Sequence, residues 1–148
     1  MSTPPTAPTA PTSTLVVLDA SVWVSRILLQ DSNHPAALSW INQHLLNGGL
    51  FVAPILFVTE TAAAVSRITG LPARGHLATR QLYAIPEMSL VQIDQPLVDE
   101  ATNLAADLKL RGADAYYVAV AKALNLPLVT FDREQLSRAA PVVTTIRP

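Results

Sequence analysis

Four acidic residues lie within or directly after apolar stretches of this sequence, although only 14% of its residues are charged. They are Asp19, Glu60, Asp114 and Asp132. A carboxylate that is withdrawn from water needs a hydrogen-bonding or charged partner, because burying it alone is strongly unfavourable. Four such groups in one place would also repel one another, and a divalent cation would relieve that repulsion. Carboxylate oxygens suit Mg²⁺ or Mn²⁺, and such an ion can activate water against a phosphodiester.

Each of the four acids also has a purely structural explanation. Asp19 and Asp132 both precede a helical pattern, so either side chain could cap a helix N-terminus. Glu60 has apolar neighbours one helical turn away on both sides and could pair with an arginine. Asp114 falls in the first turn of an apolar helical pattern, where the helix dipole favours a negative charge. These explanations stay open for each residue taken singly, and the set of four is the more specific signal.

The elements that must position these acids alternate between strand and helix patterns. Short runs rich in β-branched residues predict strands at Leu15–Asp19, Leu50–Ala53, Ser89–Ile93, Pro127–Thr130 and Val142–Thr145. Apolar residues at helical spacing predict helices at Ala20–Gln30, Pro35–Asn47, Ile55–Thr69, Ala73–Ala84, Leu97–Leu108, Ala113–Leu124 and Glu134–Arg138. This alternation predicts an α/β fold, a three-layer α/β/α sandwich with a mainly parallel central sheet. Ligands bind such sheets beyond the carboxyl ends of the strands, where Asp19 and Asp132 lie.

The composition indicates one domain preceded by a low-complexity segment. Residues 1–13 contain only Met, Ser, Thr, Pro and Ala, which predicts a disordered tail before a folded domain at residues 14–148. No run approaches the roughly 18 apolar residues of a membrane-spanning helix. Cysteine is absent and the first residues lack signal-peptide features, so we expect a cytoplasmic protein without membrane association. A net charge of -1 argues against broad electrostatic attraction to nucleic acid, so any such binding must be local or mediated by metal.

Four segments of the chain, in this order, resemble the acidic motifs of the PIN-domain family, and especially those of the VapC-type toxin ribonucleases. The segments are LVVLDAS, VTETAAAV, LRGADAYYVAVA and LVTFD. The resemblance implies a PIN-like fold in which Asp19, Glu60 and Asp114 are the principal metal ligands and Asp132 is the fourth acid. It further implies a Mg²⁺- or Mn²⁺-dependent endoribonuclease that hydrolyses RNA and has a small antitoxin protein as its partner.

Several further side chains are weaker candidates for the site. Ser21 and Thr130 match polar residues that the family places beside the first and fourth acids. Arg111 and Arg133 flank acids in the sequence and could contact substrate phosphates, although solvated or ion-paired arginines are commoner. Tyr116 and Tyr117, in the apolar pattern after Asp114, are more readily explained by core packing than by stacking on bases. The three histidines show no metal-ligand spacing, which argues against a zinc site.

The partner predictions rest on hydropathy together with the family resemblance. A mean hydropathy of +0.33 is high for a soluble monomer, which predicts a homodimer and an apolar groove for the antitoxin near the helices that contain Trp23 and Trp40. Two alternatives remain open. The chain could be a PIN nuclease of RNA processing or DNA-structure cleavage that has no antitoxin, or a non-catalytic α/β interaction module whose acids are caps and ion pairs.

Overall fold

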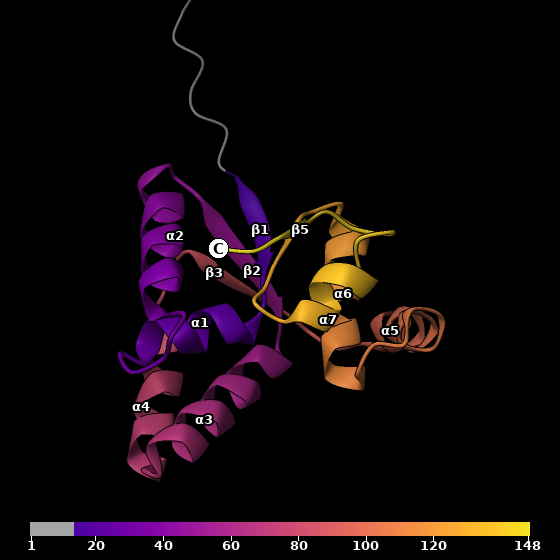
Figure 1. The fold of residues 1–148 in the computed structure, drawn as a ribbon. Helices are drawn as coiled ribbons and strands as arrows, with labels where there is room; N and C mark the ends of the chain where they lie inside the picture. Colours follow the sequence, from indigo (N-terminus) through magenta and orange to yellow (C-terminus); the bar gives the residue numbers. More distant parts are fainter. Residues whose placement is uncertain (1–13) are drawn as a thin grey trace, which may run out of the picture.

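Five parallel strands form one central sheet, with helices on both of its faces (Figure 1). The computed structural model describes residues 14–148, so the tail predicted at residues 1–13 lies outside the described residues. The strands are β1 Leu15–Leu18, β2 Leu50–Pro54, β3 Met88–Val91, β4 Leu128–Val129 and β5 Thr145–Ile146. Their order in the sheet is β3-β2-β1-β4-β5, and every neighbouring pair is parallel. The carboxyl ends of all five strands therefore face the same edge.

Helices connect the strands and complete the outer layers. They are α1 Ala20–Ile27, α2 His34–Leu46, α3 Leu56–Thr69, α4 Pro72–Tyr83, α5 Gln95–Leu108, α6 Gly112–Leu124 and α7 Arg133–Arg138. In Figure 1, α1 and α2 lie on one side of the sheet, α5 and α6 lie on the other, and α3 and α4 lie together beyond one end. This architecture confirms the predicted α/β/α sandwich with a parallel central sheet. None of the helices in residues 14–148 is long and apolar enough to cross a membrane.

The core forms where the central strand β1 meets the apolar helix α6. Val16, Val17 and Leu18 are buried, as expected for a continuous apolar run in a central parallel strand. Helix α6 is buried at most positions from Ala115 to Ala121, because its sequence is apolar almost all round. Both elements are thus fixed at the centre of the molecule, and each has an acidic residue at the end that faces the site.

Helix α3, which carries Glu60, is held in place by α4. Gly70 ends α3 in the left-handed region at φ 69°, and Pro72 begins α4 two residues later. Gly75 then allows a close approach of the two helices, because a β-carbon there would lie only 2.8 Å from the carbonyl oxygen of Ala62. The position of Glu60 is therefore set by a tightly packed helix pair.

Most element boundaries differ from the sequence predictions by one or two residues, and those of α1 and β5 differ by more. Helix α1 ends at Ile27 rather than Gln30, because the backbone N–H of Asp31 donates to the Leu28 carbonyl and closes a turn. The final strand, predicted near Val142–Thr145, begins later, since β5 contains only Thr145 and Ile146. The backbone N–H groups of Val142 and Val143 both donate to the Ala139 carbonyl, so this segment forms a turn after α7.

Candidate active site

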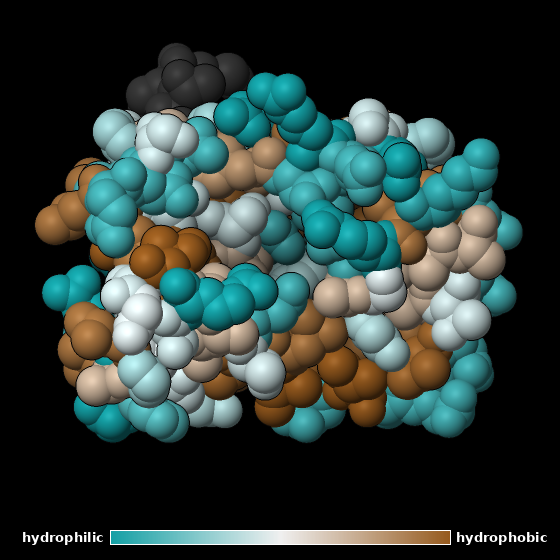
Figure 2. Space-filling model, turned by 60° about the horizontal axis from the view of Figure 1, so that its bottom comes forward, coloured by the Kyte–Doolittle hydropathy of each residue, from teal (hydrophilic) through white to brown (hydrophobic). Residues whose placement is uncertain are grey.

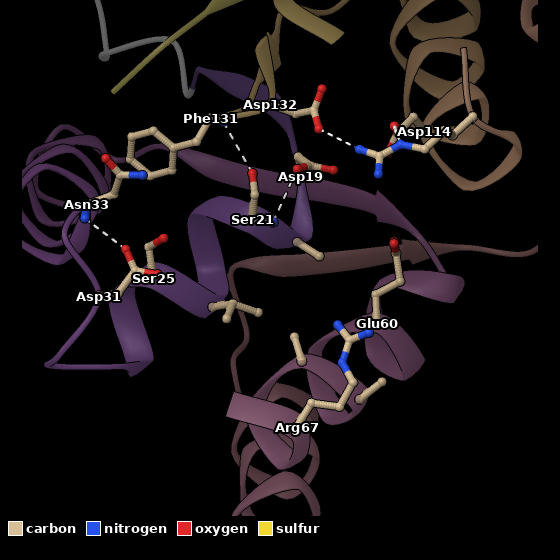
Figure 3. Close-up of a pocket in the computed structure, with 15 residues that line it drawn as sticks. Asp19, Ser21, Ser25, Asp31, Asn33, Glu60, Arg67, Asp114, Phe131 and Asp132 are labelled. Carbon is tan, nitrogen blue, oxygen red and sulfur yellow. Dashed lines mark hydrogen bonds and ion pairs between the residues drawn. The ribbon is translucent and has the colours of Figure 1, made fainter. Parts of the chain in front are cut away.

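The four acids predicted from the sequence line one open cavity of about 490 Å³ beyond the carboxyl ends of β1 and β4 (Figure 3). Asp19 follows β1, Glu60 lies on α3, Asp114 lies in the first turn of α6, and Asp132 follows β4. The backbone N–H of Asp19 donates to the Val129 carbonyl at 2.9 Å, which ties the end of β1 to the end of β4. The parallel sheet and the helices α3 and α6 thus bring together residues that are far apart in the sequence.

Asp19 is only 5% exposed and is surrounded by neutral hydrogen-bond donors. Its Oδ2 atom accepts from the Ser21 backbone N–H and the Thr130 hydroxyl, both at 3.1 Å, and its Oδ1 accepts from Gln135 Nε2 at 3.5 Å. Asp19 therefore caps α1, as its structural explanation predicted. Burial raises the pKa of Asp19, while the hydrogen bonds from Ser21, Thr130 and Gln135 partly offset that rise.

Ser21 and Thr130 connect the first and fourth acidic segments. The two hydroxyl oxygens lie 3.4 Å apart, and the Phe131 backbone N–H donates to the Ser21 hydroxyl at 3.2 Å. Thr130 is fully buried, and its hydroxyl also accepts from the Asp132 backbone N–H at 3.0 Å. These contacts hold both acidic segments in a fixed relation, which is the supporting position that the sequence resemblance implied for the two residues.

Glu60 is held by a tyrosine and not by the arginine that its structural explanation required. The Tyr117 hydroxyl donates to Glu60 Oε1 at 2.6 Å. Burial raises the pKa of Glu60, the Tyr117 hydrogen bond lowers it, and repulsion from Asp19 and Asp114 raises it further. Burial and the nearby carboxylates of Asp19 and Glu60 raise the pKa of Tyr117 as well, so its hydroxyl stays protonated and remains a donor.

We expect Tyr117→Phe to weaken divalent-metal binding by about tenfold with little loss of fold, because it removes one buried hydroxyl that orients a proposed ligand. Isothermal titration calorimetry with Mn²⁺ measures the change. Tyr116→Phe removes a hydroxyl one residue earlier on the same helix and is the matched control. Equal Mn²⁺ affinity in the two variants would show that Tyr117 only packs in the core.

Asp114 and Asp132 share one arginine. Arg111 Nε lies 3.1 Å from Asp114 Oδ2, and Arg111 Nη2 lies 2.7 Å from Asp132 Oδ2; the second contact is the dashed line from Asp132 in Figure 3. Asp132 also caps α7, because its Oδ1 accepts from the Gln135 backbone N–H at 2.9 Å. Burial and repulsion from Asp19 raise the pKa of Asp114, and Arg111 lowers it.

The basic residues of the cavity differ in part from those chosen from the sequence. Arg111 lines the cavity, whereas Arg133, the first residue of α7, is exposed and is not among the lining residues. Arg67, which the sequence reasoning missed, lines the cavity from α3 (Figure 3). Its spacing of seven residues from Glu60, two helical turns, was a signal for the shared face. Gln135 and Tyr117 were missed as site residues too, and Tyr117 lies one turn beyond Asp114.

The model of the PIN domain matches residues 16–141, which is most of the chain and includes all four acidic segments. The chain belongs to the PIN-domain family. PIN domains are generally nucleases and generally use divalent metals. The comparison with curated proteins found no match.

Solved structures share this PIN fold at low sequence identity. VapC20 of Mycobacterium tuberculosis, described as a sarcin-ricin loop cleaving toxin, has a TM-score of 0.72 and 17% identity, over 90% of this chain and 99% of that one. A chain of VapBC2 from Rickettsia felis has a TM-score of 0.67 and 13% identity, over 91% and 99%. PAE2754 from Pyrobaculum aerophilum has a TM-score of 0.62 and 21% identity, over 92% of each chain. At these identities the likeness establishes the fold.

The donor set of this PIN domain suits a hard divalent cation. Every acidic group that faces the cavity offers carboxylate oxygens, the ligands that hard cations prefer. The pKa values of Asp19, Glu60 and Asp114 are raised, mainly because burial disfavours the charged carboxylates. Within residues 14–148, however, no three Asp, Glu or His side chains are already close enough to hold one ion. The guanidinium of Arg111 bridges two of the four acids in this arrangement. The carboxylates therefore suit the ion chemically, and Arg111 must release Asp114 and Asp132 before the ion binds them.

Proposed function

We propose that this PIN domain is a Mg²⁺- or Mn²⁺-dependent endoribonuclease that hydrolyses RNA phosphodiester bonds. The observation that carries the proposal is the convergence of four carboxylates, from four separate segments, on one open cavity. In a chain with 14% charged residues, such a concentration of partly buried acids is costly unless a cation joins them.

In the proposed site Asp19, Glu60 and Asp114 hold the metal, and Asp132 supports the metal or its water. These residues would hold the ion where it could activate a water and polarise a phosphoryl oxygen of the substrate. Ser21 and Thr130 keep Asp19 in its orientation through the hydrogen bonds described above, and Tyr117 does the same for Glu60.

The two cavity arginines are suited to the substrate backbone. Arg111 and Arg67 lie on different sides of the acids, and both have exposed positions from which a guanidinium can reach a phosphate. Arg133 lies outside the cavity lining and would contact only a longer strand of RNA. An RNA substrate implies a cytoplasmic location for the activity.

A direct test uses the purified protein and a mixed pool of structured and single-stranded RNA. We expect cleavage with Mg²⁺ or Mn²⁺ and none in EDTA. Single-stranded DNA and branched DNA duplexes of matched length are the comparison substrates. Cleavage of DNA alone would support the alternative of a DNA-structure nuclease, and absence of cleavage of every substrate with metal would contradict a nuclease.

We further propose that the protein is the toxin of a toxin–antitoxin pair. This proposal is supported by the fold likeness to structures described as VapBC2 bound to promoter DNA and as a toxin-antitoxin complex from Klebsiella pneumoniae. It is also supported by a second cavity, of about 360 Å³, between α1, α2, β2 and the end of α4. Its lining is largely apolar and includes Trp23, Ile27, Leu45, Phe51 and Ile85. We name this second cavity the apolar groove.

The apolar groove lies close to the place expected from the sequence. Trp23 lines it directly, whereas Trp40 stacks on His44 at 5.0 Å instead. The Trp23 Nε1 atom is buried and has no hydrogen-bond partner among the described residues, which is unusual for a buried indole. Leu29, just after the end of α1, and Leu46, at the end of α2, are exposed. Figure 2 shows apolar side chains, in brown, gathered in patches between polar ones. A partner segment that brings apolar side chains would suit this surface.

Size-exclusion chromatography with light scattering tests the partner proposal. We expect a homodimer alone, and a larger complex when the product of a neighbouring small gene is added. Leu45→Ala, at a partly buried position of the apolar groove, should weaken that complex by roughly tenfold, because an apolar contact at the interface is lost, and exposed Tyr83→Ala is the control. A strict monomer that forms no complex but cleaves RNA would leave the nuclease proposal intact and favour the alternative of RNA processing without an antitoxin.

A non-catalytic interaction module is the second candidate, and specific contacts favour it. Asp19 and Asp132 do cap helices, and Arg111 does neutralise part of the acidic charge. A cap uses only one carboxylate oxygen, however, so capping and metal binding are compatible. Titration with Mn²⁺ separates the candidates, because a module whose acids serve only as caps and ion pairs would bind no metal at this site.

A further inference from the structure

Arg111 is the only cation of residues 14–148 that forms an ion pair with any of the four acids. It joins two of them, through Nε to Asp114 and through Nη2 to Asp132, which lie in segments 18 residues apart in the sequence. Asp19 and Glu60, in contrast, accept hydrogen bonds from neutral groups of the described residues. Arg67 also lines the cavity, but among the described residues the ion pairs of the four acids all come from the Arg111 guanidinium.

The Arg111 side chain is free to leave this position. It is 69% exposed, although the carboxylates that it contacts are 13% and 22% exposed. It occupies the N-cap position of α6 without a side-chain capping bond, and the next residue, Gly112, has open space around the position of a β-carbon. Moving the guanidinium outward would expose no apolar core and would break two ion pairs only.

A divalent cation and the Arg111 guanidinium serve the same electrostatic need. Both would bind Asp114 and Asp132, and the two positive groups would repel each other if they bound the acids together. The ion carries two positive charges on a small sphere and can bind more oxygens than a guanidinium can. The planar guanidinium instead donates hydrogen bonds from its edge to two carboxylates. The two states therefore exclude each other at these carboxylates.

We propose that Arg111 is an internal counter-ion, which neutralises Asp114 and Asp132 in the metal-free protein and is displaced from them when a divalent cation binds. This proposal rests on the metal site of the proposed function. The Arg111 guanidinium would stabilise the metal-free protein despite its clustered acids. It would also lower the affinity for metal, because the ion has to displace it. By thermodynamic reciprocity, whatever strengthens the Arg111 contacts weakens metal binding by the same factor.

Calorimetric titration of the full chain with Mn²⁺ and with Mg²⁺ tests the competition. Arg111→Gln keeps the length and hydrogen-bonding capacity of the side chain but removes its charge, and we expect it to tighten the metal Kd by about tenfold. Without metal, the same variant should melt at a lower temperature than the wild type. Arg80→Gln removes the same charge from an exposed position on α4, and it should leave the Kd within about twofold, because salt screens distant charges.

Nuclear magnetic resonance gives a second measurement that requires no catalysis. The Arg111 Nε–H signal, assigned by its loss in Arg111→Gln, should shift in the wild type when Mg²⁺ replaces the ion pairs. A metal Kd that is unchanged or weaker in Arg111→Gln, or an Nε–H signal that does not respond to saturating Mg²⁺, would overturn the proposal. So would the absence of metal binding by both proteins. If Arg111→Gln tightens metal binding but the wild type cleaves no RNA, the counter-ion proposal stands and the nuclease proposal is contradicted.

Discussion

Asp114→Asn should leave the fold intact and lower RNA cleavage by about a hundredfold to a thousandfold, the range seen when one preorganised group of an active site is removed. The amide has the shape of the carboxylate but not its charge, so it binds Mg²⁺ or Mn²⁺ weakly. Asp114 lies in the first turn of the buried helix α6, which fixes its direction, and it is part of the cavity wall. Initial rates of cleavage of a labelled RNA at saturating Mn²⁺ measure the effect.

The control for this experiment is Asp107→Asn, which makes the same change at an exposed position on α5. Its cleavage rate should equal that of the wild type. Circular dichroism and thermal melting must show that both variants are folded. Near-normal cleavage by a well-folded Asp114→Asn protein would remove Asp114 from the catalytic set.

The second large effect concerns the pH dependence of stability, which should reverse when metal is added. Burial raises the folded-state pKa values of Asp19, Glu60 and Asp114 above their ordinary values of 3.8 for Asp and 4.5 for Glu. The metal-free native state then holds protons that the unfolded chain has released. The contribution of these groups to the free energy of unfolding is therefore fully present below the ordinary values and is lost as the pH rises through the folded-state values.

Urea unfolding in EDTA, from about pH 4 to about pH 7, measures this loss. The matched comparison is Glu60→Gln, which keeps an oxygen to accept the Tyr117 hydrogen bond but no longer titrates. Relative to this variant, the wild type should lose stability as the pH rises. A constant difference between the two proteins across the range would show that burial and repulsion do not shift the pKa of Glu60.

Added metal should reverse this pH dependence, so that stability increases as the pH rises. The reason is that an ion that binds ionised carboxylates stabilises the native state more at higher pH. At a metal concentration of about 100 times its Kd, linkage gives about 2.7 kcal/mol, or a rise in melting temperature of roughly 5 to 10 °C for a domain of this size. The gain should shrink on acidification. A melting temperature near pH 7 that does not respond to Mn²⁺ would contradict the metal site.

The parts of the site that follow from sequence are those with local signals. An apolar run that ends in an acid predicted both the strand and the position of Asp19 at its carboxyl end, because a parallel sheet aligns such ends. The apolar character of α6 predicted its burial and the direction of Asp114. The pattern of Glu60 among apolar neighbours predicted a carboxylate in need of a partner, although the partner itself was not identified.

The parts that the sequence did not predict depend on contacts between distant segments. Tyr117 and Glu60 are 57 residues apart, and no local pattern indicates that the tyrosine hydroxyl reaches this carboxylate. Gln135 is fully buried beside Asp19, yet in the sequence it is one polar residue of a short helical segment. Arg111 was considered as a phosphate ligand, whereas its pairing with Asp132 depends on how α6 packs beside the end of β4.

Helix α1 contributes to two different surfaces within eight residues. Ser21, Val24 and Ser25 line the acidic cavity, whereas Trp23 and Arg26 line the apolar groove. If the groove receives the antitoxin, a mutation in α1 can therefore affect the acidic site, antitoxin binding or both. Few positions of α1 could then change without loss of one of these activities. Under that proposal, changes in partner choice would accumulate on α2 and α4, which border the groove and contribute no residue to the acidic cavity. The partner surface could then change while the acidic site stays unchanged.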